Sequence, residues 1–106
     1  MILNPDKVYA ELIESGEDWA DAEAGADLLS EGRRPCIAQL MCEIQGSRTE
    51  AEQIALASQT YRDYIVKMVA ARKEANIARV RYSAVQTLAE LRRTQESTRR
   101  QEMKLV

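Results

Sequence analysis

The fold of this chain is decided by residues 60–93, which read TYRDYIVKMVAARKEANIARVRYSAVQTLAELRR and contain neither glycine nor proline. Apolar residues repeat through and just before this stretch in two columns with seven-residue spacing. The first column is Ile54, Tyr61, Met68, Ala75, Tyr82 and Ala89, and the second is Ala57, Tyr64, Ala71, Ala78 and Val85. Such heptads indicate a helix that packs on another helix along one seam, and the alanines would let that neighbour approach closely.

The helical pattern extends beyond this stretch in both directions. Ser47 followed by Glu50 is the capping-box pattern that begins many helices, and from there to Val106 the chain contains no glycine or proline. We therefore expect one long helix over about residues 49–103. It would measure ~80 Å at 1.5 Å per residue, so it needs neighbours that bury its apolar faces.

The N-terminal part of the chain supplies the first neighbour. Asn4 and Pro5 form a typical helix start, with a capping side chain before proline at the first helical position. An apolar seam follows at alternating spacings of four and three: Val8, Leu12, Ser15, Trp19, Ala22, Ala26 and Leu29. The seam passes Gly16, so this segment is either one helix over about residues 5–31 or two shorter helices.

A break at Gly32–Pro35 divides this first arm, because proline disfavours the helical conformation of the residue before it. A second piece is expected over about residues 35–45, with four buried side chains: Ile37, Leu40, Met41 and Ile44. The expected fold is therefore all-α. It is an antiparallel, coiled-coil-like helical hairpin that forms one domain over residues 1–106, with a kinked first arm and a turn near residues 46–49.

Charge supports the pairing of the two arms. Residues 1–61 hold twelve acidic and four basic residues, whereas residues 62–106 hold eleven basic and five acidic ones. A turn near residue 47 places residues opposite each other when their numbers sum to roughly 95. This predicts Glu23 near Arg72, Glu17 and Asp18 near Arg79, and Glu14 near Arg81.

The end of the second arm, residues 92–106, is expected to project beyond the first arm as a basic helix tip. Its basic residues are candidates for contact with an acidic protein surface or with nucleic acid: Arg92, Arg93, Arg99, Arg100 and Lys104. Arg93 and Arg100 continue a column that includes Arg72 and Arg79. Two copies paired through the seam would bring such columns together, which disfavours a simple homodimer on this seam.

A further apolar face adjoins the seam on the long helix. It consists of Leu56, Ala70, Ile77, Ala84, Leu91 and Leu105, with Val66, Val69 and Val80 nearby. Two apolar faces on one helix indicate more than one neighbouring helix. We expect the second neighbour to be another subunit, giving a homo-oligomer that is a dimer or larger.

Several classes of function are disfavoured by what the sequence lacks. It has no histidine and no glycine-rich phosphate loop, so we expect no enzyme, metal site, cofactor or small-molecule substrate. Cys36 and Cys42 are spaced as neither a metal pair nor a disulfide within a helix, and we expect both to be reduced and buried. No signal peptide or membrane span is evident, so we expect a cytoplasmic protein that does not contact membranes.

Two runs carry a resemblance to known proteins. ARKEANIARVRYSAVQTLAELRRTQESTRRQEMKL (71–105) and DWADAEAGADLL (18–29) resemble small, all-helical accessory proteins encoded in bacteriophages and prophages. The resemblance implies a cytoplasmic protein of phage origin, of the kind found in early or recombination gene clusters. It assigns no role to any residue.

These observations predict a non-enzymatic protein-interaction or assembly module. It would self-associate through the alanine- and tyrosine-rich seam, and its basic tip would meet an acidic surface on another copy or on a phage or host protein. The expected seam residues are Trp19, Tyr61, Tyr64, Met68, Ala75, Ala78, Tyr82, Val85, Leu88 and Leu91. The alternative is a sequence-independent nucleic-acid-binding accessory factor in phage recombination or replication, disfavoured because no aromatic side chain lies among the arginines to stack on bases.

Overall fold

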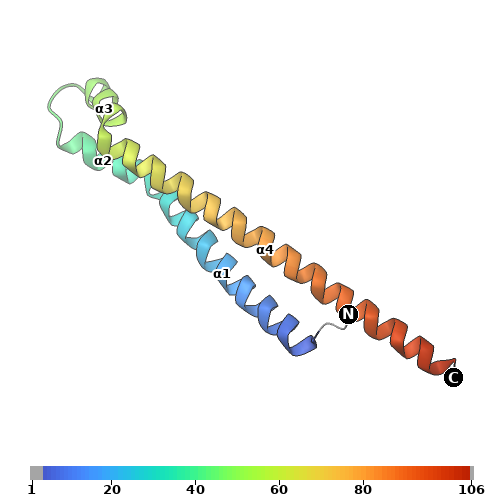
Figure 1. Ribbon diagram of the computed structural model, residues 1–106. Helices are drawn as coiled ribbons and strands as arrows, with labels where there is room; N and C mark the ends of the chain where they lie inside the picture. Colours follow the sequence, from blue (N-terminus) through green and yellow to red (C-terminus); the bar gives the residue numbers. More distant parts are fainter. Residues whose placement is uncertain (1–3, 106) are drawn as a thin grey trace. The chain divides into compact units, whose positions relative to one another are not determined.

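The computed structural model describes residues 4–105, and over this range the chain forms helices and no strand. The helices are α1 (Pro5–Glu31), α2 (Arg33–Cys42), α3 (Arg48–Ala57) and α4 (Gln59–Lys104) (Figure 1). The predicted all-α fold, with a kinked first arm and a long final helix, is thereby confirmed.

The chain divides into two compact units, and α1 and α4 each contribute to both. The terminal unit comprises Met1–Asp21 and Asn76–Val106, and the turn unit comprises Ala22–Ala75. This division was not predicted from the sequence. Within each unit, contacts between α1 and α4 join residues far apart in the chain, such as Trp19 and Tyr82 in the terminal unit.

Helix α1 is continuous through Gly16, so the prediction of a single helix to Glu31 is the correct alternative. Its start is capped as expected, because the Asn4 side-chain oxygen accepts hydrogen bonds from the backbone N–H groups of Asp6 (3.0 Å) and Lys7 (3.4 Å). In the terminal unit, a Cβ atom at Gly16 would lie 3.3 Å from the Tyr82 ring. The glycine thus lets an aromatic ring of α4 lie against the backbone of α1.

The kink between α1 and α2 falls at Gly32. The hydrogen-bond pattern nearly continues across it, since Gly32 donates to the Leu28 carbonyl (2.9 Å) and Cys36 donates to the Gly32 carbonyl (3.0 Å). Helix α2 begins at Arg33, two residues before Pro35. Proline is tolerated in the first turn because the backbone N–H groups there have no partner within the helix, so the missing N–H of proline costs no hydrogen bond. It ends at Cys42, earlier than the predicted residue 45.

The side chains of α2 are less buried than predicted. Ile37, Leu40, Met41 and Ile44 are half-buried, Cys36 is half-buried and Cys42 is exposed. Both cysteines are free thiols, but the prediction that both are buried is wrong. A ten-residue helix that packs on another ten-residue helix, α3, has too few neighbours to exclude solvent from one whole face.

The second arm is two helices, not the single helix predicted over 49–103. The Ser47 cap is present, with its hydroxyl accepting from Glu50 N–H at 3.2 Å, but α3 stops at Ala57 and Ser58 takes an extended conformation (φ −72°, ψ 152°). The Ser58 hydroxyl donates to the Ala55 carbonyl (2.6 Å) and accepts from the Tyr61 N–H (3.2 Å). One side chain therefore ends α3 and begins α4, which needs neither glycine nor proline.

The break shifts the heptad phase, so the two predicted columns do not cross it. In α3 the buried residues are Ala51 and Ala55, whereas Ile54 is 52% exposed and Ala57 is exposed. The seam prediction at Ile54 and Ala57 is wrong for this reason. From Tyr61 onward the columns hold.

Along α4 the predicted seam is the buried face. Its residues are buried or half-buried: Tyr61, Tyr64, Met68 and Ala75 in the turn unit, and Ala78, Tyr82, Val85 and Ala89 in the terminal unit. On α1, Val8, Ser15 and Ala26 are buried and Trp19 is half-buried. Leu88 and Leu91 are 42% and 49% exposed, so α1 does not cover them as it covers the rest of the predicted seam. They lie on another face of α4.

The kink at Gly32 depends on Tyr64 within the turn unit. The Tyr64 hydroxyl donates to the Leu29 carbonyl (2.6 Å), one of the last carbonyls of α1, which have no partner within that helix. A Cβ atom at Gly32 would lie 2.5 Å from this hydroxyl oxygen. Glycine is therefore required for close approach here, and not for an unusual backbone angle, because its φ is −76°.

Gly32→Ala should consequently destabilise the protein by about 1 kcal/mol, the net value of the hydrogen bond that the new methyl group displaces. In a Tyr64→Phe background the obstructing oxygen is gone, and the same substitution should be neutral or stabilising by up to about 1 kcal/mol, because alanine restricts the unfolded chain. Urea denaturation followed by circular dichroism of all four proteins measures this cycle. Equal effects of Gly32→Ala in both backgrounds would contradict the proposed contact.

Candidate interaction surfaces

The seam of the terminal unit is occupied by the chain's own helices. Trp19 of α1 packs on Tyr82 of α4 with ring centroids 5.3 Å apart and an interplanar angle of 35°. Ser15, one turn before Trp19, is fully buried and its hydroxyl donates to the Leu12 carbonyl at 3.2 Å. These seam residues hold α1 against α4, and so they present no free face to a second copy.

In the turn unit, Arg72 of α4 bridges two carboxylates of α1. Its guanidinium donates to Glu23 at 2.8 Å and to Asp27 at 2.9 Å, which confirms the predicted proximity of Glu23 and Arg72. The hydrogen bonds to Asp27 and Glu23 raise the pKa of Arg72 above its ordinary value. Since this pKa lies far above neutrality, Arg72 keeps its positive charge at neutral pH.

In the terminal unit, Arg81 makes the corresponding contacts. It binds Glu11 at 2.8 Å and Asp18 at 3.0 Å, and Glu14 lies at 4.0 Å. The prediction for Glu14 is confirmed. The pKa of Arg81 is raised, chiefly by its hydrogen bond to Glu11.

The prediction that Glu17 or Asp18 pairs with Arg79 is wrong. Asp18 pairs with Arg81 instead, and no ion pair involves Arg79 among residues 4–105. At 100° per residue, Arg79 and Arg81 lie on opposite sides of the α4 seam, about 160° apart. When two antiparallel helices pack along a seam, each flank of one helix faces one particular flank of the other. The acidic residues of α1 before Ala22 lie on the flank that faces Arg81, or point away from α4. Before Ala22, the flank of α1 that faces Arg79 carries only uncharged residues.

The basic tip contains one half-buried arginine and four exposed basic residues. The Arg92 side chain is only 14% exposed and pairs with Glu96 at 3.1 Å, so it is a poor candidate for contact with a partner. The exposed ones are Arg93, Arg99, Arg100 and Lys104. None of these four takes part in an ion pair within the described range 4–105.

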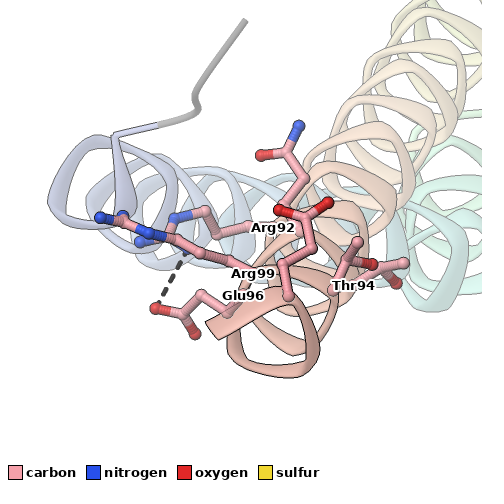
Figure 2. A pocket seen from close by; sticks show the side chains of 7 residues that line it. Arg92, Thr94, Glu96 and Arg99 are labelled. Atoms are coloured by element: carbon pink, nitrogen blue, oxygen red, sulfur yellow. Dashed lines mark ion pairs between the residues drawn. The ribbon is translucent and has the colours of Figure 1, made fainter. Parts of the chain in front are cut away.

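A shallow hollow lies beside this tip, and Arg92 and Arg99 point along it with Glu96 (Figure 2). Its described lining residues are all from α4: Arg92, Thr94, Gln95, Glu96, Thr98, Arg99 and Glu102. Arginines and glutamates alternate here, so the hollow has no strong net charge. It is an open surface of one helix and does not enclose a ligand.

A second apolar surface runs along the outside of α4 in the terminal unit. We call it the outer stripe, and it consists of Ile77, Val80, Ala84, Leu88 and Leu91. The four larger side chains are between 42% and 63% exposed. The stripe lies ~120° around the helix from the seam at 100° per residue. The second apolar face predicted from the sequence is therefore present and uncovered in this part of α4.

Two other kinds of site are absent from residues 4–105. No cluster of three or more cysteine, aspartate or glutamate side chains in this range is arranged to hold a metal ion. None of its helices combines the length and apolar character that crossing a membrane requires. The outer stripe and the exposed basic residues of α4 are therefore the candidate sites.

Arg81 and Arg79 form a matched pair for testing the ion pairs. Arg81→Gln should lower the thermal midpoint in low salt, because three carboxylates of α1 lose their cation. The loss should shrink in ~1 M salt, where the Debye length falls to ~3 Å. Arg79→Gln removes the same charge and side chain from the same helix and should leave the midpoint nearly unchanged at both salt concentrations. Equal destabilisation by the two substitutions would show that the ion pairs of Arg81 do not stabilise the unit.

Comparison with known proteins adds no relative to this picture. No protein family, no curated protein and no solved structure matches the chain. The resemblance to phage-encoded accessory proteins stays a prediction.

Proposed function

We propose that the protein is a non-enzymatic helical interaction module that self-associates, with the outer stripe of α4 as the contact between copies. The observation that supports this most is the row of four half-exposed, large apolar side chains on one face of one helix. Isolated apolar residues on a surface are ordinary, but a periodic row over four turns is typical of a helix that binds another helix. The predicted use of the seam is revised, since the chain's own α1 covers it.

A second copy suits the outer stripe because the stripe's flanks are nearly free of charge. In a parallel pair of α4 helices, Ile77, Ala84 and Leu91 would occupy one core position, with Val80 and Thr87 at the other. The flanking pairs between copies would be Asn76 with Arg81, Ser83 with Leu88, and Glu90 with Gln95. No pair brings like charges together, in contrast to pairing through the seam.

The strength of this contact follows from the exposed apolar surface. Complete burial of a large apolar side chain is worth about 1.5–3 kcal/mol, so a half-exposed one contributes about 1 kcal/mol. Eight such side chains across two copies give about 8 kcal/mol, against an association cost of about 4–15 kcal/mol. The outer stripe alone would thus support a weak, concentration-dependent dimer, and stable assembly needs a further contact.

Sequence-independent binding of nucleic acid is the second candidate function. It is favoured by the exposed basic residues of the tip, which have no acidic partner in the described part of the chain. It is disfavoured by the overall acidic character, with a pI of about 5.2, and by the absence of aromatic side chains among these residues. A phage-derived, cytoplasmic setting is compatible with either function and remains part of the proposal.

Replacing two stripe residues tests the proposed function. The double variant Ile77→Gln and Leu88→Gln removes four apolar side chains from a dimer, or about 4 kcal/mol, which is roughly a thousand-fold increase in Kd. Sedimentation velocity over a range of concentrations should show self-association of the unaltered protein and a monomer for the variant.

Leu28→Gln is the control, because Leu28 is a large exposed apolar residue on α1 and lies outside the stripe. It should self-associate like the unaltered protein. A monomer for the unaltered protein at every concentration, in low and high salt, would refute self-association.

A further inference from the structure

We propose that a basic stripe on α4 docks on an acidic face of α1 in a second copy of the chain. The basic stripe is Arg79, Arg93, Arg100 and Lys104, and the acidic face is Glu14, Glu17 and Asp21. Both belong to the terminal unit. This inference rests on the proposed self-association and identifies a second contact between copies, formed by charge instead of apolar side chains.

In the part of the chain that the structure describes, the basic stripe has no ion-pair partner. Its four residues are exposed and follow one flank of the α4 seam. Among residues 4–105, none of them forms an ion pair. The register set by Arg81 with Glu11 and Asp18 places the start of α1 at Pro5 opposite about residues 87–94 of α4. Arg100 and Lys104 therefore extend beyond the acidic helix of their own copy.

Most of the acidic face of α1 likewise forms no close ion pair among residues 4–105. Glu17 and Asp21 are exposed and form no ion pair in the described part of the chain. Glu14 is mostly exposed and lies at the outer limit of ion-pair distance, 4.0 Å, from an arginine that already holds two closer carboxylates. The acidic face thus has negative charge to offer to a partner.

The spacing of the charges fits one helix against another. Arg93 and Arg100 are seven residues apart, and so are Glu14 and Asp21; each spacing is ~10.5 Å along a helix. Two helices that cross at a shallow angle could therefore form both ion pairs at once, with Lys104 and Glu17 adjacent to them. This match favours a helical acidic partner over nucleic acid, because the stripe offers no residue that would stack on bases. The chain itself provides such a helix.

The two surfaces cannot satisfy each other within one copy. Glu14 lies on the Arg81 flank of the seam, whereas Arg79, Arg93 and Arg100 lie on the opposite flank. A contact between different surfaces of two copies is heterologous, and it produces a ring if it closes and an open chain if it does not. We therefore expect species larger than a dimer at low salt, with the outer stripe as an additional contact.

Charge inversion with complementation tests the proposal. Variant one carries Arg93→Glu and Arg100→Glu; variant two carries Glu17→Arg and Asp21→Arg, chosen because neither of these acidic residues pairs within the chain. In ~50 mM salt each variant alone should associate at least about tenfold more weakly than the unaltered protein, because like charges then meet. An equimolar mixture should regain association, since each inverted surface meets its inverted complement. Circular dichroism checks that both variants keep their helices.

The outcomes separate this proposal from the proposed function. If association is insensitive to salt and to both charge inversions, but is lost when Ile77 and Leu88 are replaced, the charge contact is refuted and self-association through the outer stripe is supported. Failure of the mixture to regain association would also overturn the charge contact, whereas a monomer throughout would overturn both. Binding of a labelled DNA duplex at ~50 mM salt that variant one loses without any change in association would assign the basic stripe to nucleic acid instead.

Discussion

An arginine of α4 forms an ion pair with α1 only where α1 presents a carboxylate on the same flank of the seam, and this constraint decides which charges of the two helices stay unpaired among residues 4–105. Arg72 meets Glu23 and Asp27, and Arg81 meets Glu11 and Asp18, each on its own flank. The acidic residues of α1 change flank between these two positions, while the arginine column continues along α4. Among residues 4–105, every arginine of that column after Arg72 consequently lacks an ion-pair partner, and the unpaired charges on both helices have this one geometric cause.

The apolar packing that sets this geometry uses small residues beside large rings. Gly16 leaves space for Tyr82 in the terminal unit, and Gly32 leaves space for the Tyr64 hydroxyl in the turn unit. Among the buried residues of α4 are Ala75 and Ala89, which let the backbones approach closely. A core built from alanine and half-buried tyrosine buries little apolar surface for its length, so a substantial share of the large aliphatic residues stays outside. The exposed leucines and valines of α4 follow from this arrangement.

Much of this could be predicted from the sequence, because helical periodicity reports burial directly. The seam from Tyr61 to Ala89, the caps at Asn4 and Ser47, and the proximity of Glu23 to Arg72 all follow from spacing along the chain. The break at Ser58 could not be predicted, since it depends on one hydroxyl that serves two helix ends, and serine is common inside helices without breaking them. Counting residues from the turn placed Asp18 near Arg79, whereas Asp18 pairs with Arg81. Only the rotation of α1 about its own axis decides between them.

Position around the helix axis also decides the environment of each arginine in the basic tip. Arg92 continues the seam and is covered, Arg99 lies beside alternating glutamates, and only Arg93 and Arg100 share a flank with Arg79. A basic cluster defined by sequence proximity therefore separates into three environments once the helix is formed. The flank that carries Arg79, Arg93 and Arg100 repeats at the spacing of Glu14 and Asp21 on α1. Within one copy, Glu14 lies on the other flank of the seam. In the proposed charge contact, a chain with such surfaces would lower its electrostatic energy by meeting another copy of itself, and the nearly uncharged flanks of the outer stripe would add no repulsion between the copies.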